Sequence, residues 1–220
     1  MLLRGIELLC KSDEEFNRLI APNQKKIISL LNRYIKEIEL FNPAYGLVGA
    51  ENTEELIIKH ILDSLAPAGI ISRLLASEKN PKIADIGSGA GLPGIPLAAA
   101  LPSCSFTLIE RMSRRAGFLH NTKAVLALDN IIVEETQLEK TATSRFDLIT
   151  FRAFKPLEPK LLKTLLKTCS EKGIIAAYKG KKEKIKEEMK PLQEMTIKWE
   201  AIPCKVPFLD EERHLLVIRN

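Results

Sequence analysis

Four glycines lie close together at positions 87, 89, 91 and 94, within the segment Asp85-Ile86-Gly87-Ser88-Gly89-Ala90-Gly91-Leu92-Pro93-Gly94. Glycine tolerates positive φ and allows close approach to the backbone, so such a cluster is typical of a loop that binds a nucleotide-like ligand. An apolar stretch at residues 83–86 precedes the loop, and another at residues 93–101 follows it. The pattern predicts a binding loop between a strand and a helix.

The glycine spacing leaves several ligands open. Residues 89–94 match G-x-G-x-x-G, the dinucleotide pattern, but two residues count against that interpretation. Asp85 places a carboxylate where it would repel a pyrophosphate, and Pro93 removes a backbone N–H that a phosphate would use. S-adenosyl-L-methionine has no phosphate and carries a sulfonium and an ammonium group, which an acid favours. We therefore expect this cofactor, with a dinucleotide and a tight turn that binds nothing as alternatives.

Glu110, at the end of the strand that we expect at residues 105–109, stands where an acid can hold the ribose of either cofactor.

The residues after the strand that we expect at residues 146–150 indicate the acceptor chemistry. Residues 150–154 read Thr-Phe-Arg-Ala-Phe, which lacks the Asn/Asp-Pro-Pro-aromatic tetrad of amine methylation and the Pro-Cys of a covalent route. Pro203-Cys204 occurs later, and we interpret Cys204 as a buried thiol. N7 of guanine has a free lone pair and needs no base, so it is consistent with this pattern.

A sheet must hold these residues in place. From residue 80 onward strands and helices alternate, which predicts an α/β fold with a mainly parallel sheet. We expect strands at residues 83–86, 105–109, 131–133, 146–150 and 173–178, and helices at residues 93–101, 113–128 and 157–169. Two late strands, at residues 197–206 and 214–219, are joined by a short loop and should be antiparallel. A Lys/Glu-rich stretch at residues 179–190 predicts a solvated helix.

The first 79 residues indicate helices only. Apolar residues recur every three or four positions between residues 27 and 38, and Asn52 with Glu55 predicts a capping box for a second helix. Pro22 suits the first turn of the earlier helix, and Pro67 interrupts the later one. We expect an N-terminal helical cap at residues 1–79 and a Rossmann-like catalytic domain at residues 80–220, with a seven-stranded sheet whose last strand is antiparallel.

Composition limits the partners and the location. The chain has 220 residues with 33 Lys and Arg against 28 Asp and Glu, and its net charge of +5 permits an anionic partner without requiring one. No apolar run is long enough to span a membrane, and the start does not resemble a signal peptide. The cysteines are far apart and no two histidines stand at i, i+4. We therefore expect no metal site and a reducing, cytoplasmic location.

Several separated stretches together resemble one family. They are His60-Ile61-Leu62-Asp63-Ser64, the loop at residues 85–96, Arg114-Arg115 with Phe118-Leu119, Arg152-Ala153-Phe154, Lys179-Gly180 and Glu212-Arg213-His214-Leu215. From about residue 23 to the C-terminus the sequence is similar to the RsmG family, also called glucose-inhibited division protein B. The resemblance implies a class I, Rossmann-like methyltransferase that uses S-adenosyl-L-methionine to methylate N7 of a guanine in 16S, small-subunit ribosomal RNA.

Roles for individual residues follow from both arguments. The patterns above predict that Asp85, Gly89 and Glu110 bind the cofactor, and the resemblance adds Gly87, Leu92, Leu138, Glu139 and Arg152. The resemblance further implies RNA contacts at Arg114, Arg115, Lys179 and Arg213, although the arginine pair also fits a solvated helix face. His60, Asp63 and Ser64 would form a wall of the pocket, with a core histidine as the alternative for His60. No catalytic nucleophile or base is expected.

The chain departs from the family pattern at three places. Gly46-Leu47-Val48 replaces Asn-Leu-Thr, Phe151 replaces a small residue, and Glu211 replaces a glycine. None lies in the glycine loop, so cofactor binding is the prediction least affected. Two other functions stay open, a small-molecule methyltransferase with the cap as a lid and a non-catalytic ribosome-assembly factor. We expect a monomer that acts on small-subunit ribosomal RNA or a ribosomal particle, without a metal or a membrane.

Overall fold

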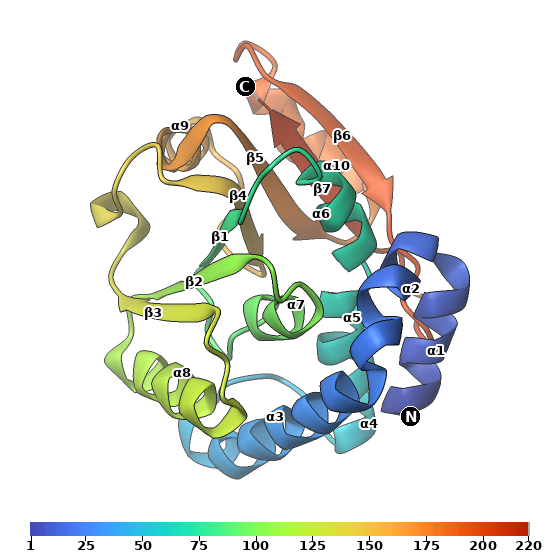
Figure 1. Cartoon of the computed structure of the whole chain (residues 1–220). Helices are drawn as coiled ribbons and strands as arrows, with labels where there is room; N and C mark the ends of the chain where they lie inside the picture. Colours follow the sequence, from blue (N-terminus) through green and yellow to red (C-terminus); the bar gives the residue numbers. More distant parts are fainter. Residues whose placement is uncertain (220) are drawn as a thin grey trace.

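A seven-stranded sheet forms the centre of the computed structural model, which describes residues 1–219 (Figure 1). Asn220, the last residue of the predicted catalytic domain, lies outside the described residues. The strand order is β3-β2-β1-β4-β5-β7-β6. The strands are β1 (Lys82–Ile86), β2 (Ser105–Glu110), β3 (Ile131–Glu135), β4 (Phe146–Arg152), β5 (Cys169–Lys179), β6 (Lys198–Pro203) and β7 (His214–Arg219).

Strand pairing confirms the predicted sheet. The pairs that join β1, β2, β3, β4 and β5 are all parallel, whereas β7 pairs antiparallel with both β5 and β6. The last strand in the sequence therefore runs against its neighbours. The chain order reverses on either side of β1, which lies between β2 and β4. In a sheet of this kind a ligand crevice forms at the carboxyl ends of the strands beside such a reversal.

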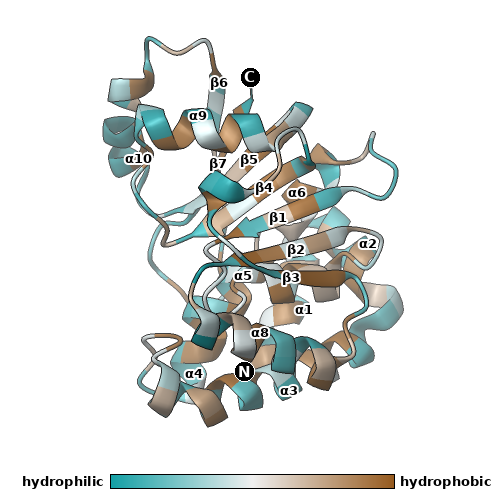
Figure 2. Ribbon diagram, turned by 90° about the vertical axis from the view of Figure 1, so that its left-hand side faces the viewer, coloured by the Kyte–Doolittle hydropathy of each residue, from teal (hydrophilic) through white to brown (hydrophobic). Residues whose placement is uncertain are grey.

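Helices cover both faces of the sheet. One face carries α7 (Gly94–Ala100), α8 (Ser113–Leu126) and the N-terminal helices, and the other carries α9 (Pro159–Thr168) and α10 (Lys182–Met189) (Figure 1). The alternation of strand side chains explains the two cores: in β7, Leu215 and Val217 join the first core, and Leu216 and Ile218 join the second. In Figure 2, α3 and α8 alternate hydrophobic with hydrophilic residues, as expected for helices with one buried face. Short helices η3 (Leu138–Lys140) and η4 (Lys190–Leu192) complete this part.

The N-terminal segment is helical throughout. Its elements are α1 (Leu2–Ser12), α2 (Glu14–Ile20), η1 (Ala21–Asn23), α3 (Gln24–Tyr45), α4 (Thr53–Leu56), the π-helix η2 (Ile57–Leu62), α5 (Asp63–Leu65) and α6 (Ala68–Leu74). Their buried side chains belong to the same hydrophobic core as those of α7 and one sheet face. The hydroxyl of Tyr34 on α3 also donates a 2.6 Å hydrogen bond to the carbonyl of Ala90 in the glycine loop. The domain boundary near residue 80 stays a prediction.

Local details differ from the expected pattern in small ways. The side chain of Asn52 accepts from the N–H of Glu55 at 2.9 Å as predicted, but Glu55 returns its bond to the N–H of Glu51 instead of Asn52. Pro22 lies in η1, just before α3 and not in its first turn. Lys179 ends β5, so the Lys/Glu-rich helix begins only at Lys182. No helix within residues 1–219 is both long and apolar enough to cross a membrane.

Candidate functional site

The glycine loop leaves the carboxyl end of β1 and leads into α7. Gly87 has a φ of 68°, in the left-handed region that favours glycine. A Cβ at Gly87 would also lie 2.7 Å from a ring carbon of Phe154, closer than side chains pack. Both the backbone angle and the neighbouring ring therefore require glycine, and the loop presents bare backbone at this point.

Asp85, at position four of β1, is completely buried beneath the loop. Its Oδ2 accepts a 3.0 Å hydrogen bond from the N–H of Gly94, at the first residue of α7, and its Oδ1 has no partner among the described residues. Burial raises the pKa of Asp85 from 3.8 to about 7. The carboxyl thus fixes the start of α7, at an electrostatic cost when it is ionised.

Glu110, the last residue of β2, holds two backbone segments. Its Oε2 accepts from the N–H of Gly89 and its Oε1 from the N–H of Met112, both at 2.9 Å. The side chain therefore joins the glycine loop to the segment that follows β2. Because each carboxylate oxygen has a second lone pair, Glu110 can still accept a hydrogen bond from a ligand.

A cleft of about 390 Å³ opens beside the loop, at the carboxyl ends of β1, β2 and β4. Its lining includes five residues from the sequence prediction, namely Gly87, Glu110, Arg115, Leu138 and Glu139. The volume lies within the range of about 300–1,000 Å³ that small-molecule sites occupy. The structure thus brings together residues from four separate segments of the chain at one site.

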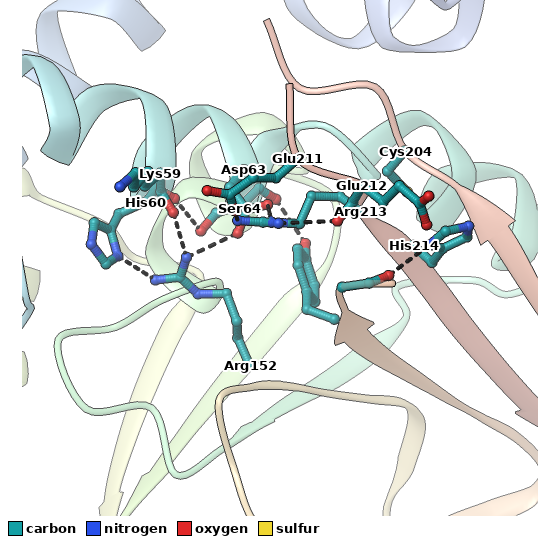
Figure 3. Close-up of polar contacts among 12 residues, drawn as sticks. Lys59, His60, Asp63, Ser64, Arg152, Cys204, Glu211, Glu212, Arg213 and His214 are labelled. Carbon is teal, nitrogen blue, oxygen red and sulfur yellow. Dashed lines mark hydrogen bonds and ion pairs between the residues drawn. The ribbon is translucent and has the colours of Figure 1, made fainter. Parts of the chain in front are cut away.

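Three other predicted cofactor residues do not line this cleft. Asp85 lies beneath the loop as described, Gly89 is held by Glu110, and Leu92 is 5% exposed and packs in the core shared with the N-terminal helices. Arg152 is the fourth residue outside the lining, because its side chain turns toward the N-terminal helices (Figure 3). The direct cofactor contacts of these four residues stay predictions.

Arg152, the last residue of β4, is held by one helical turn of the N-terminal segment (Figure 3). Its Nη1 donates to the carbonyl of Lys59 at 2.8 Å and to Oδ2 of Asp63 at 2.9 Å, and its Nη2 lies 2.8 Å from Nδ1 of His60. Burial, together with the positive charge of Arg152, lowers the pKa of His60 to about 4. The imidazole is therefore neutral near pH 7, and its Nδ1 acts as an acceptor.

Asp63 joins a second arginine to the same cluster. Its side chain is 6% exposed, and Oδ1 lies 3.2 Å from Nε of Arg213. Next to it, the hydroxyl of Tyr178 donates to the carbonyl of Ser64 at 2.7 Å. Three of the stretches that suggested the family, around His60, Arg152 and Arg213, therefore meet in one buried polar network (Figure 3).

The chain is similar to known proteins over most of its length. The family model described as rRNA small subunit methyltransferase G, GidB, matches residues 27–216. A protein named Ribosomal RNA small subunit methyltransferase G from Treponema denticola is 37% identical over all of this chain and 94% of its own length. Its namesake in Treponema pallidum is 41% identical over 91% of this chain and 88% of that protein.

The chain belongs to the ribosomal RNA small subunit methyltransferase G family. Solved structures agree on the fold. A SAM-dependent methyltransferase from Aquifex aeolicus covers 71% of this chain and 92% of its own, with a TM-score of 0.56 and 15% identity. TYW2 of P. horikoshii, in complex with MeSAdo, covers 67% of this chain and 60% of its own, with a TM-score of 0.50 and 14% identity. The fold is the predicted class I, Rossmann-like methyltransferase fold.

Four residues that line the cleft had no role predicted from the sequence. They are Arg111, Met112, Phe154 and Lys155, and the ammonium of Lys155 lies 6.0 Å from the ring centre of Phe154. Arg111 and Met112 are the two residues after Glu110, Phe154 ends the Arg-Ala-Phe stretch, and Lys155 follows it. Because the carboxyl ends of parallel strands meet at one edge, the residues after each strand were the available signal.

The cations predicted to face RNA fall into two groups. Lys179 pairs with Glu188 at 2.7 Å, and Arg213 pairs with Asp63 and with Glu211. In contrast, Arg114 and Arg115 form no ion pair within residues 1–219 and donate only long hydrogen bonds, of 3.3 and 3.4 Å, to the carbonyls of Ala44 and Gly46 at the C-terminal end of α3. The second group is therefore freer to contact a phosphate, and the RNA contacts of all four stay predictions.

The departures from the family pattern have local explanations. The segment Gly46-Leu47-Val48 is held by Asn42, whose Oδ1 accepts from the N–H groups of Leu47 and Val48 at 2.7 and 2.9 Å. Phe151 is 1% exposed in the second core, and the ammonium of Lys179 lies 5.9 Å from its ring centre. Glu211 supplies the second partner of Arg213 at 2.8 Å. None of these residues lines the cleft.

A metal ion and a reactive thiol would each need side chains arranged for them. Within residues 1–219, no group of three or more His, Cys, Asp and Glu side chains is arranged to hold a metal ion. Burial raises the pKa of Cys204 to about 12, so its thiol is protonated near pH 7 and is a poor nucleophile. The cleft itself is lined, among the described residues, by no histidine, cysteine or tyrosine.

Proposed function

We propose that this protein transfers a methyl group from S-adenosyl-L-methionine to N7 of a guanine in 16S ribosomal RNA. The observation that carries the proposal is the family match over residues 27–216, together with relatives named for small-subunit ribosomal RNA. The protein acts as a cytoplasmic monomer.

The cleft has the chemistry that the cofactor requires. Its volume of about 390 Å³ suits a ligand of this size, and the bare backbone at Gly87 allows close approach. Leu138 and Ile109 offer apolar contacts for an adenine ring, and the carboxylates of Glu110 and Glu139 can accept hydrogen bonds from ribose hydroxyls. When bound there, the cofactor supplies an electrophilic methyl group on a sulfonium.

Guanine N7 suits a site without a general base. Its lone pair attacks without loss of a proton, so the residues of the chain need only bind the base, orient it and exclude water. Phe154 is the aromatic side chain that lines the cleft, and it offers a face on which a base can stack. The absence of histidine, cysteine and tyrosine from the described lining is consistent with this acceptor.

Cations at the mouth of the cleft suit an RNA backbone. Arg111 and Arg115 line it from the segment after β2 and Lys155 from the segment after β4, and Arg114 lies next to the first two with its guanidinium 5.4 Å from the ring centre of Tyr45. A small number of placed cations predicts RNA binding with a shallow salt dependence, because few phosphates are neutralised.

The test is a methylation map. Small subunits and 16S RNA from a strain without the gene are incubated with the protein and with labelled S-adenosyl-L-methionine, and the modified base is located by cleavage at N7-methylguanosine. We expect label at one guanine. Label on a ring carbon or a ribose would exclude N7. Label only on small molecules would favour a metabolite methyltransferase, and RNA binding without any label would favour an assembly factor.

A further inference from the structure

The guanidinium of Arg152 is bound by three acceptors from one short segment of the N-terminal helices. Its acceptors are the carbonyl of Lys59, the carboxylate of Asp63 and Nδ1 of His60, all within 2.9 Å and all from residues 59–63. The Arg152 side chain is 16% exposed and that of Asp63 is 6% exposed. These contacts cross from the end of β4 to the N-terminal helices, 89 to 93 residues earlier in the chain.

The backbone of residues 57–62 brings these acceptors together. Residues Ile57–Leu62 form a π-helix, a wide turn that is rare and is often found at functional sites. The wide turn and the α-helical residue that follows it present one carbonyl and two side chains to the same guanidinium (Figure 3). The ring of His60 is oriented from its other side, where Nε2 lies 3.5 Å from the carbonyl of Gly49. A neutral His60 with its proton on Nε2 satisfies both contacts.

The contacts leave part of the guanidinium available. Of its five N–H groups, Nη1 uses two and Nη2 uses one, so Nε and one N–H of Nη2 have no partner among the described residues. Ala153 and Phe154, the next two residues of the chain, line the cleft. A carboxylate is the group that a partly engaged, buried guanidinium binds best, and the methionine end of the proposed cofactor carries one.

We propose that His60 and Asp63 are positioning residues, which orient the Arg152 guanidinium so that its remaining donors hold the carboxylate of the cofactor. This inference rests on the proposed function. It assigns the N-terminal helices a part in cofactor affinity that acts through Arg152, beyond covering one face of the sheet. Asp63 has a second task, because it separates the positive charges of Arg152 and Arg213.

Two substitutions at His60 separate the effect of its hydrogen-bond acceptor on Arg152 from the effect of its side-chain volume. In His60→Asn the amide oxygen can replace the Nδ1 acceptor, whereas His60→Leu removes it at similar volume. We expect the dissociation constant of S-adenosyl-L-methionine, measured by calorimetry on the full chain, to rise about tenfold in His60→Leu and by less than about threefold in His60→Asn. Asp63→Asn should weaken binding at least as much as His60→Leu. The controls are His120→Leu and Asp129→Asn, because both wild-type side chains are exposed and outside the site.

Two further measurements complete the test. The midpoint of thermal unfolding without ligand reports any merely structural effect, and the KM for small subunits reports an effect on RNA. Equal loss of cofactor affinity in His60→Leu and His60→Asn would overturn the inference. So would a lower unfolding temperature at unchanged cofactor affinity, or an effect confined to the KM for RNA. If the wild-type protein binds the cofactor but methylates no RNA, the proposed function fails while the calorimetric series still decides the positioning role.

Discussion

Replacing Asp85 with asparagine should stabilise the protein at alkaline pH and not at acid pH. Asp85 is fully buried, and burial raises its pKa from 3.8 in the unfolded chain to about 7 in the folded one. The folded protein therefore binds more protons than the unfolded chain between these two values. By linkage, the free energy of unfolding falls as pH rises from about 4 to about 7, and then stays level.

The magnitude follows from the two pKa values. A difference of about 3 units corresponds to about 4 kcal/mol of lost stability above pH 7, at about 1.4 kcal/mol per unit. In Asp85→Asn the amide oxygen would keep the bond from the Gly94 N–H, but the amide N–H groups would take the place of the unpartnered Oδ1, at a cost of about 1–3 kcal/mol. We therefore expect a net gain of about 1–3 kcal/mol at pH 8.5 and none at pH 5.

Urea unfolding of Asp85→Asn and of the wild type at pH 5 and pH 8.5 measures this difference. An equal slope of the unfolding free energy against urea concentration would show that the folded and unfolded states of the two proteins are comparable. Asp129→Asn is the matched control, because Asp129 is exposed and should show no such pH dependence. A stability difference between Asp85→Asn and the wild type that is the same at both pH values would refute the reasoning, because the ionised carboxylate would then carry no buried cost.

Three other substitutions test the loop, the cap and the RNA surface. Gly87→Ala should lower the unfolding temperature and weaken cofactor binding in calorimetry, because the new Cβ meets Phe154 at positive φ; Gly117→Ala, in α8 with open space around it, should do neither. Tyr34→Phe removes the bond to the Ala90 carbonyl and should lower stability by about 1–3 kcal/mol in calorimetric unfolding, whereas Tyr45→Phe, which removes a hydroxyl from a partly exposed ring, should not. Arg115→Gln should lower the slope of log binding constant against log salt concentration by about one, as expected for the loss of one phosphate contact, when RNA binding is measured by filter binding. Lys179→Gln should leave this slope unchanged, because Lys179 is already paired with Glu188.

The sequence was sufficient to predict the fold and much of the cleft, because both depend on local patterns. Short apolar runs that alternate with helical stretches define the parallel sheet, and the glycine loop after β1 places Gly87 at the cleft. Glu110 could be predicted from its place at the end of the second strand. The resemblance to a family supplied Leu138 and Glu139, which no periodicity could have indicated.

The contacts between distant segments could not be predicted in the same way. The sequence cannot show that Asp63 faces Arg152 and Arg213, because the three residues are brought together only by the packing of helices on the sheet. Lys179 is a similar case, since its charge suggests a phosphate until Glu188 is found beside it. Phe154 was named in a motif, but its place in the cleft depends on how the chain turns after β4.

The wide turn at residues 57–62 also sets the phase of the helix that contains it. A regular α-helix advances by about 100° per residue, and a π-turn accommodates one residue more than that period allows. Leu56, which is buried, and Asp63, which faces Arg152, therefore keep the relative orientation that a regular helix with one residue fewer would give them. Removing a single residue from the turn would restore a regular helix without rotating its two ends against each other, so the packing of the segment should survive while the carbonyl and side chains that hold Arg152 lose their places.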